Sequence, residues 1–370
     1  MTKILFLIPS LMHGGAEKVL VNLVNNLDQN KYYITLYCIF DEGVNKQFLN
    51  KNVKYRSKFK KVFRGNSQLM KLFSPKFLYQ YFIKEDYDIL VSYLEGPAAR
   101  IISGCTNPKT KKVAWIHSDM LNENLASVGF RNLAEAQTGY NQFDRIVGVS
   151  KSVVNSFQKM LQRQVPLQVL YNVNETEKIR LLSRKNHVDL FPENKITICS
   201  AGKLSANKGF DRLLEVHDRL MKEGLLHQIN ILGIGEDQAK LEKRIKELDF
   251  EDSFKLVGFH KNPYQYMIKC DLYVCASHRE GFSTAVTEAL ILGIPVVSTN
   301  CSGAHELLGE NNDFGIVTEN STDGIYSGLK EMLTNPEKLK FYTQQAKLRG
   351  DFFSTENTVR AIDHFFDSLL

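Results

Sequence analysis

The sequence predicts an α/β protein of two domains, each built on a parallel, Rossmann-like sheet. Three observations support this prediction. The 370 residues are enough for two hydrophobic cores. Short apolar runs of strand length alternate with helical segments, an order that is typical of parallel sheets. A strand that leads through a glycine-containing turn into a helix begins each of two series, at residues 3–9 and at residues 196–200.

The boundary between the domains is expected in the polar segment 174–194. We therefore place the first domain at residues 1–175 and the second at residues 190–350. Residues 325–348 and 354–370 are predicted to be helical. The six cysteines include no CxxC pair, so we expect buried free thiols and neither zinc nor disulfides.

The composition is that of a globular protein, with 43% hydrophobic and 24% charged residues. No apolar run reaches the ~18 residues that a membrane span needs. The run Ile4–Ile8 is too short for the core of a signal peptide, and no small-residue cleavage site follows it. These features predict a cytoplasmic location.

The charge is unevenly distributed along the chain. Residues 1–185 contain 27 Lys and Arg against 14 Asp and Glu, whereas residues 186–370 contain 20 against 27. Residues 54–84 carry nine basic residues, no acidic residue and many interleaved apolar ones, on segments predicted to form helices. This pattern favours docking on an anionic membrane surface, with a solvated basic face as the alternative. No nucleic-acid-binding module accompanies the charge, so no nucleic acid is expected as a partner.

In the first domain, the strand at residues 3–9 leads to Gly14 and Gly15 and then to an amphipathic helix. Glycines there let the backbone approach a ligand closely, or simply make a turn. The GxGxxG pattern is absent, so a nicotinamide enzyme is not supported. Polar residues follow three later strands, and His117 stands after one of them, which suggests a common cleft rim.

In the second domain, Lys203 and Lys208 lie in the loop between the strand at residues 196–200 and the next helix. Two lysines five positions apart in such a loop form a cationic site suited to a diphosphate, unless both are ordinary surface lysines. Residues 256–260 precede another turn and end at His260.

Residues 270–306 contain a strand, a loop, a helix and a second strand, so the two strands should be parallel. Glu280 lies in the loop and Glu288 lies in the following helix. Ser283 or Thr284 is predicted to cap that helix, and the amides near its start suit a phosphate or a sugar hydroxyl. Spacing alone leaves open that Glu280 ends a surface loop and that Glu288 is solvated.

The pattern as a whole is more specific than its spacing. Glu280-Gly281-Phe282, Glu288-Ala-Leu, Gly293-Ile-Pro-Val-Val and then Gly303 and Glu306 resemble the retaining nucleotide-sugar glycosyltransferases of family 4, of the bacterial polysaccharide and glycoconjugate type. The resemblance covers nearly the whole chain and is most specific in residues 196–306. It implies the GT-B fold, with two Rossmann-like domains facing across a cleft and a C-terminal helix, 352–370, that crosses back to the N-terminal domain.

The resemblance also implies roles for the two domains and for individual residues. The N-terminal domain would bind the acceptor and the C-terminal domain the sugar nucleotide. Lys208 would stabilise the leaving diphosphate, Glu280 would orient the donor sugar, and His117 would face that sugar. Donor-binding residues are implied in the glycine loop, the lysine loop, the start of the helix after Glu280 and the nucleobase region: Gly14, Gly15, Lys203, Gly281, Phe282, Ser283, Thr284, Glu288 and His260. Lys203 stands where the family usually has arginine, which alone makes a planar two-pronged contact.

The predicted reaction is the transfer of a sugar from a nucleoside-diphosphate sugar, expected to be a UDP-linked hexose or N-acetylhexosamine, to a hydroxyl of a glycan acceptor. A lipid-linked acceptor would suit surface polysaccharide or glycoconjugate synthesis on the inner face of the cell membrane. No DxD-type metal site stands out, so neither a metal nor another cofactor is expected. The alternatives are a GT-B sugar-nucleotide epimerase, a phosphorylase-like enzyme, and a non-catalytic homologue that binds sugar nucleotides or scaffolds a membrane assembly.

Overall fold

The chain forms two compact units. The computed structural model describes residues 1–12, 14–161, 165–185 and 195–370. One unit comprises Met1–Val173 together with Glu356–Leu370, and the other comprises Asn174–Thr355. The expected start of the second domain at residue 190 and the end of the expected junction lie outside the described residues.

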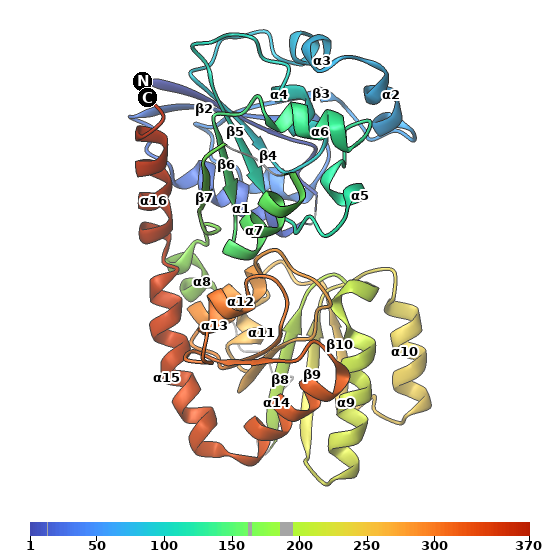
Figure 1. Ribbon diagram of the computed structural model, residues 1–370. Helices are drawn as coiled ribbons and strands as arrows, with labels where there is room; N and C mark the ends of the chain where they lie inside the picture. The colour runs from blue at the N-terminus through green and yellow to red at the C-terminus, as the bar shows by residue number, and fades with distance from the viewer. Residues whose placement is uncertain (13, 162–164, 186–194) are drawn as a thin grey trace. The chain divides into compact units, whose positions relative to one another are not determined.

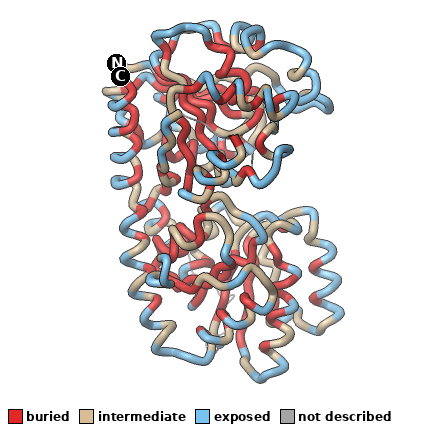
Figure 2. Tube along the Cα trace, in the orientation of Figure 1, coloured by how far each residue is buried: buried red, intermediate tan, exposed pale blue. Residues whose placement is uncertain are grey.

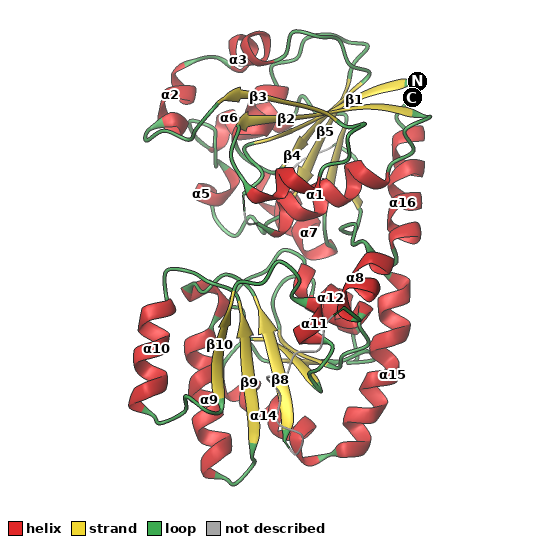
Figure 3. Cartoon of the chain, turned by 180° about the vertical axis from the view of Figure 1, so that it is seen from behind, coloured by secondary structure: helices red, strands yellow, loops and turns green. Residues whose placement is uncertain are grey.

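A parallel sheet forms the centre of the first unit (Figures 1 and 3). Within the described residues it has seven strands in the order β3-β2-β1-β4-β5-β6-β7. The strands are β1 (Thr2–Ile8), β2 (Tyr32–Phe40), β3 (Lys54–Phe59), β4 (Ile89–Tyr93), β5 (Lys111–Ile116), β6 (Arg145–Gly148) and β7 (Leu167–Val169). The inner strands are almost continuously apolar, because a parallel sheet is covered by helices on both faces. Figure 2 accordingly shows these strands as the most buried part of the unit.

Helices and short turns connect these strands. They are α1 (Gly15–Asn26), η1 (Val44–Phe48), α2 (Asn66–Leu72), α3 (Pro75–Phe82), α4 (Pro97–Ile102), α5 (Glu123–Ala126), α6 (Leu133–Tyr140) and α7 (Lys151–Leu161). The prediction that residues 54–84 lie on helical segments was wrong at its start, because residues 54–59 form β3, which pairs in parallel with β2. Polar and apolar residues alternate there with a period of two, which suits the exposed edge of a sheet.

The second unit repeats the same topology. Within the described residues its sheet has six strands in the order β10-β9-β8-β11-β12-β13. The strands are β8 (Ile196–Ala201), β9 (His227–Leu232), β10 (Phe254–Gly258), β11 (Leu272–Cys275), β12 (Val296–Thr299) and β13 (Ile316–Thr318). β11 and β12 are parallel, as predicted from the strand, loop, helix and strand of residues 270–306.

Helices lie against both faces of this sheet, and one face packs a hydrophobic core that includes residues of α9 and α14. The helices and turns are α8 (Thr176–Ser183), η2 (Ala206–Lys208), α9 (Phe210–Lys222), α10 (Gln238–Glu247), α11 (Tyr264–Met267), α12 (Thr284–Ile291), α13 (Ala304–Leu308), α14 (Thr322–Thr334) and α15 (Pro336–Phe352). Residues 325–348 are therefore two helices and not one. The break falls at Asn335, whose side chain caps α15 by accepting from the Lys338 amide, and Pro336 starts that helix.

The C-terminal helix α16 (Thr355–Asp367) packs on the sheet of the first unit. The Phe366 ring lies 6.2 Å from that of Phe6 in β1 and 6.0 Å from that of Tyr32 in β2. The Asp363 carboxylate accepts hydrogen bonds from the Tyr32 hydroxyl at 2.6 Å and from the Lys31 ammonium at 2.9 Å. The predicted return of the chain to its N-terminal domain is thus confirmed.

Candidate active site

The strand order of each sheet reverses once, and the loops at that point carry the predicted site residues. In the second unit the reversal lies between β8 and β11, and in the first unit between β1 and β4. Ligands of open α/β sheets bind outside the carboxyl ends of the strands at such a switch point. The loop after β8 contains Lys203 and Lys208, and the loop after β11 contains Glu280.

Lys208 and Glu280 form an ion pair across the switch point of the second unit. The Lys208 ammonium donates to Glu280 Oε1 at 2.6 Å, and both side chains are largely buried, with 24% and 14% exposed. Burial by itself lowers the pKa of Lys208, but the negative charge and the hydrogen bond of Glu280 outweigh it and raise that pKa. Lys208 is therefore a fixed cation at neutral pH.

Glu280 is also held by a residue that the sequence did not single out. The Ser277 hydroxyl donates to the same oxygen, Glu280 Oε1, at 2.6 Å. The Ser277 carbonyl in turn accepts from the Thr299 hydroxyl at 2.7 Å, which ties the loop to the end of β12. Within the described chain no hydrogen bond to Glu280 Oε2 is found, so this second oxygen remains available to a ligand hydroxyl.

A glycine lets the two loops approach each other. Gly209 follows η2 with φ +64°, and a Cβ there would lie 2.2 Å from the Ala276 carbonyl oxygen at the end of β11. The buried Arg212 guanidinium donates to the same carbonyl from Nε at 2.9 Å. A side chain at position 209 would push the lysine loop away from Glu280.

Helix α12 begins directly after Glu280. Ser283 is its cap, as predicted, and its hydroxyl accepts from the Val286 amide at 3.4 Å. Gly281 and Thr284 flank the start of the helix. The Phe282 ring is buried and lies 5.6 Å from the Phe353 ring, so its side chain is a packing group that anchors this turn.

Glu288 is buried in α12 with only 5% of its surface exposed, which argues against the alternative of a solvated helix residue. The Tyr264 hydroxyl of α11 donates to Glu288 Oε1 at 3.2 Å. A buried carboxylate is costly unless polar groups satisfy it. Its position on α12, the helix that follows the Glu280 loop, suits the binding of a polar ligand group.

Lys203 lies in the loop after β8 and His260 in the loop after β10, and each has its own partner. The Lys203 ammonium pairs with Glu236 Oε2 at 2.7 Å, and both side chains are more than half exposed. The His260 Nε2 hydrogen-bonds the Val257 carbonyl at 3.1 Å, and its ring lies 4.2 Å from that of Tyr266. The two lysines of the predicted cationic site thus bind separate carboxylates, and only Lys208 contacts Glu280.

The remaining predicted residues lie at the carboxyl ends of β1 and β5 in the first unit. Gly14 is the residue before α1, and a Cβ on it would lie 1.8 Å from Glu17 Oε2. Gly15 begins α1. The space beside Gly14 is therefore filled by the Glu17 side chain, and burial raises the pKa of that carboxyl.

His117 follows β5 and is fixed by two residues next to the switch point. Its backbone amide donates to Glu95 Oε2 at 2.9 Å, and its ring lies 4.6 Å from the Tyr93 ring. Leu94, between these two, has a φ of +132°, a strained value for a branched side chain. Burial lowers the pKa of His117 to about 3, and its covered Nε2 has no hydrogen-bond partner in the described part of the chain. The imidazole is thus neutral.

Three of these supporting contacts were not predicted, although Glu95 is one of the polar residues that follow strands and Tyr264 lies in the expected nucleobase region. Ser277 lies three positions before Glu280, a spacing at which a loop hydroxyl reaches a following carboxylate, so a local signal existed. Tyr264 lies 24 positions from Glu288, and Glu95 lies 22 positions from His117. No pattern in the neighbouring sequence predicts either of these two contacts.

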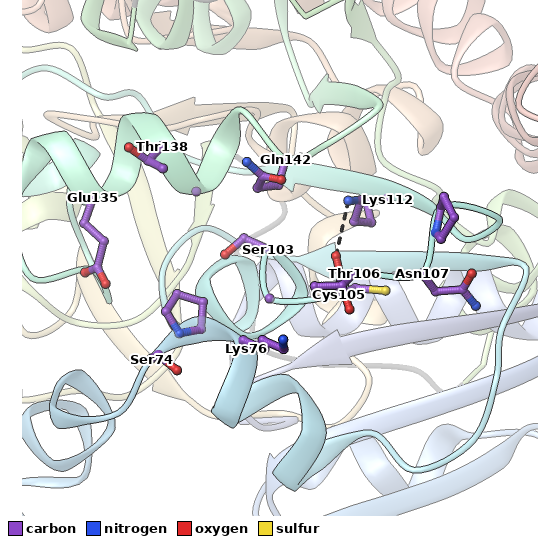
Figure 4. Close-up of a pocket in the computed structure, with 14 residues that line it drawn as sticks. Ser74, Lys76, Ser103, Cys105, Thr106, Asn107, Lys112, Glu135, Thr138 and Gln142 are labelled. Atoms are coloured by element: carbon purple, nitrogen blue, oxygen red, sulfur yellow. Dashed lines mark hydrogen bonds between the residues drawn. The ribbon is translucent and has the colours of Figure 1, made fainter.

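A separate pocket of about 610 Å³ lies in the first unit, away from these loops (Figure 4). Cys105, Thr106 and Asn107 line it just before β5 begins, and Gln142 lines it shortly before β6. It therefore lies toward the amino ends of the strands. Figure 4 shows Lys112 at its rim, where the ammonium approaches the Cys105 carbonyl at 3.5 Å.

Two further properties bear on the chemistry. Outside residues 13, 162–164 and 186–194, no group of three or more His, Cys, Asp or Glu is placed to hold a metal ion. Among the same described residues, none of the helices combines the length and apolar character that crossing a membrane requires.

Comparison with known proteins decides the family. The family described as Glycosyl transferases group 1 matches residues 183–349, and the family described as Glycosyltransferase Family 4 matches residues 13–178. An N-acetylgalactosamine-N,N'-diacetylbacillosaminyl-diphospho-undecaprenol 4-alpha-N-acetylgalactosaminyltransferase of Campylobacter jejuni is 30% identical over 281 residues, which cover 75% of this chain and 72% of that protein. The chain belongs to glycosyltransferase family 4.

Two further known proteins match this chain over nearly its full length. The amylovoran biosynthesis glycosyltransferase AmsD of Erwinia amylovora is 24% identical over 94% of both chains. The crystal structure of Anabaena Alr3699/HepE in complex with UDP and glucose superposes with a TM-score of 0.80 at 20% identity, covering 100% of both chains. The GT-B fold of two Rossmann-like domains and the glycosyltransferase class of this enzyme are therefore confirmed.

Proposed function

We propose that this family 4 enzyme is a retaining glycosyltransferase that moves a sugar from a nucleoside-diphosphate sugar to a hydroxyl group of a glycan acceptor. The observation that carries the proposal is the Lys208–Glu280 pair at the β8/β11 switch point. The donor we propose is a UDP-linked hexose or N-acetylhexosamine. The Anabaena structure, which contains UDP and glucose, and the N-acetylgalactosaminyl group in the name of the Campylobacter enzyme support that choice.

The two units are proposed to divide the substrates between them. The second unit, around Lys208 and Glu280, binds the sugar nucleotide, and the first binds the acceptor. In the first unit Gly14 and Gly15 approach the donor diphosphate, and the neutral His117 faces the donor sugar. The unpartnered His117 Nε2 supports this role, because a buried nitrogen without a partner is costly until a ligand hydroxyl pairs with it.

The chemical step needs stabilisation of the leaving group. As the bond between the anomeric carbon and the diphosphate breaks, negative charge grows on the diphosphate oxygens. Lys208 meets that charge in a partly buried setting where electrostatic interactions are strong. Lys203 and the backbone amides near Ser283 and Gly15 further stabilise the charge on the diphosphate. The proposed mechanism is therefore metal-independent, with protein cations in place of a metal ion.

The two glutamates are proposed to have separate tasks. Glu280 receives donor-sugar hydroxyls on Oε2, while Lys208 and Ser277 hold Oε1. Glu288 binds the ribose hydroxyls and is oriented by Tyr264. Retaining glycosidases use two carboxylates that flank one bond. A carboxylate that binds ribose cannot serve in such a pair, so double displacement through Glu288 is not favoured.

The acceptor we propose is a lipid-linked glycan in the synthesis of a surface polysaccharide or glycoconjugate, at the inner face of the cell membrane. The diphospho-undecaprenol in the name of the Campylobacter enzyme and the amylovoran synthesis named for AmsD support this choice. The basic excess of residues 1–185 supports an anionic membrane surface as a partner.

A panel of UDP-, GDP- and ADP-sugars tests the proposal by slow donor hydrolysis and by transfer to a lipid-linked acceptor. We expect hydrolysis of one UDP-sugar, an α-linked product from an α-linked donor by proton NMR, and unchanged rates after EDTA treatment. Epimerisation without an acceptor would identify an epimerase, and binding without turnover would identify a non-catalytic homologue. Loss of activity with EDTA would overturn the metal-independent mechanism.

A further inference from the structure

Large hydrophobic side chains gather on the surface of α2, α3 and the turn before them. α2 and α3 lie at the outer edge of the first unit in Figure 1, and Figure 2 shows most of this segment as exposed. We call these seven exposed side chains the α2–α3 ridge: Val62, Phe63, Leu69, Leu72, Phe73, Phe77 and Tyr81. Leu72, with 74% of its surface exposed, is the most exposed of them. A contiguous exposed apolar patch of this kind marks an interaction site.

Three rings of the ridge form an ordered stack. The Phe73 and Phe77 rings lie 5.0 Å apart at an interplanar angle of 19°, and the Phe77 and Tyr81 rings lie 6.2 Å apart at 9°. Phe77 and Tyr81 are four residues apart in α3 and so lie on one face of that helix, whereas Phe73 lies in the extended turn that precedes it. The Lys58 ammonium covers the far end, 3.8 Å from the centre of the Tyr81 ring. The ridge is therefore a preformed surface and not a set of scattered side chains.

The fold holds α2 in place although α2 buries none of its own residues. The guanidinium of Arg100, which is buried, donates to the carbonyls of Met70 at 2.8 Å and Phe73 at 2.7 Å. Arg131 Nε donates to the Lys71 carbonyl at 2.6 Å. Arg100 is itself anchored by Glu135 at 2.8 Å. Because α2 has only partly buried residues such as Met70, burial in its own unit stabilises it little, and the hydrogen bonds from Arg100 and Arg131 hold it at the surface.

Unpaired cations surround the ridge. Residues 43–84 contain no Asp or Glu. Lys54 and Arg56 are neutralised by Glu85. Within the described part of the chain, no ion pair is found for any of the six basic residues at positions 60–84: Lys60, Lys61, Arg64, Lys71, Lys76 and Lys84. The ridge segment thus carries an excess of positive charge, with the Glu42 carboxylate at its edge, where Oε1 accepts from the Val62 amide at 2.9 Å.

We infer that the α2–α3 ridge inserts into the headgroup region of an anionic lipid bilayer, with these six cations on the lipid phosphates. Apolar and aromatic residues flanked by basic ones are typical of an interfacial membrane-binding segment. Protein interfaces are depleted in lysine, which argues against a protein partner. The inference rests on the proposed function in one respect: membrane binding would bring the enzyme to a lipid-linked acceptor.

Insertion of the ridge and purely electrostatic docking differ in how membrane binding depends on salt concentration. Binding through cations alone would be lost at high salt, because the Debye length falls to ~3 Å at 1 M and the attraction is screened. Binding through inserted apolar side chains does not depend on charge and would persist. We therefore expect binding to liposomes that contain phosphatidylglycerol to weaken, but not to vanish, when NaCl is raised from low to near-molar concentration.

Two matched pairs of variants test the inference by sedimentation with these liposomes, without donor or acceptor. Leu69→Ser with Leu72→Ser and Phe77→Ser should lower the liposome-bound fraction at least tenfold at every salt concentration. The control changes three exposed apolar residues of the second unit, Leu226→Ser with Phe341→Ser and Leu348→Ser, and should bind as wild type.

The second pair of variants tests the cations. Replacing Lys60, Lys61, Arg64 and Lys76 with serine should abolish the preference for anionic lipid. The matched control, with serine at Lys240, Lys246, Lys269 and Lys340, should keep that preference.

A tryptophan at position 72 reports insertion directly. Trp115 is buried, so its emission should stay constant. In Leu72→Trp the added emission should shift to the blue with liposomes and be quenched by brominated lipid. Circular dichroism melting and donor hydrolysis identify variants that are folded, and hydrolysis that persists while binding is lost separates this inference from the proposed function.

Three results would overturn the inference. One is wild-type protein that binds no anionic liposomes, and another is equal binding by the ridge variant. The third is a wild-type dimer in light scattering that the ridge variant converts to a monomer without any binding to liposomes, since the ridge would then be an interface between copies of this chain.

Discussion

Lys208 and Glu280 are 72 positions apart in the chain, yet the Lys208 ammonium donates to Glu280 Oε1 at 2.6 Å. The pair joins the two loops at the point where the strand order of the second sheet reverses. The negative charge and the hydrogen bond of Glu280 raise the pKa of Lys208 and keep the lysine ionised in a partly buried setting. In the proposed mechanism the donor diphosphate meets a cation whose position is already set, so little reorganisation is needed when charge develops on the leaving group.

We expect Lys208→Ala to raise the barrier for transfer by about 2–4 kcal/mol, the order that is observed when one electrostatic donor is lost. This corresponds to a turnover about 30- to 1000-fold lower. Lys203→Ala should cost less, because Lys203 is mostly exposed and pairs with Glu236. Lys240→Ala, on the surface of α10, is the control. Steady-state kinetics measure these effects, and near-normal turnover of Lys208→Ala would remove Lys208 from the mechanism.

The two glutamates should differ in which kinetic constant they affect. Glu288→Gln should weaken donor binding with little change in turnover, because a ribose contact is made in the ground state and the transition state alike. Glu280→Gln should lower kcat more than it raises KM. The measurement is kcat and KM for the donor at saturating acceptor. The opposite split would show that the two roles are wrongly assigned.

Ser277 is predicted to act by positioning Glu280. Hydrogen bonds to charged groups are worth about 1.5–3 kcal/mol, so Ser277→Ala should lower kcat by about tenfold or more, with little change in donor KM. Ser277→Thr keeps the hydroxyl and should restore most of the rate. Equal losses in both variants, or a loss confined to thermal stability, would mean that the hydroxyl does not act through Glu280.

A buried pair of histidines should make the second unit sensitive to acid. His227 donates from Nδ1 to the Leu225 carbonyl, so its Nε2 accepts from His217 Nδ1 at 2.9 Å, and His217 Nε2 accepts from the Ser253 hydroxyl. In this arrangement both rings are neutral, and each carries one N–H. Burial, and then the neighbouring His227, lower the pKa of His217 to about 3, and burial lowers that of His227.

The unfolded state therefore binds protons more readily than the folded state below the ordinary histidine pKa of about 6.5. Stability should be fully present above that value and fall as the pH drops from about 6.5 toward 3. His217 alone should account for about 2 kcal/mol at pH 5. Urea unfolding at pH 7.5 and pH 5 measures the difference, and His217→Asn, which takes up no proton, should reduce it. A wild-type free energy of unfolding that is equal at both pH values would contradict this account.

Much of the fold could be predicted because the signals are local. The alternation of apolar runs with helices, the capping by Ser283 and the parallel β11–β12 pair follow from residues near one another in the chain. Residues 54–59 were misassigned because their period-two pattern is short and lies beside basic helical segments. Their pairing with β2, about 20 positions away, made them a strand.

For the site, the sequence by itself predicted which residues would carry the chemistry: two loop lysines, two glutamates and a histidine after a strand, in a pattern that identifies the family. Only the tertiary structure decided how they are held. It paired Lys208 and not Lys203 with Glu280, set Ser277 and Tyr264 behind the two carboxylates, and left the α2–α3 ridge exposed. The physical reason is that hydrogen bonds and burial depend on which distant segments the sheet brings together. Residue type and spacing describe only the side chains and the local structure of each segment.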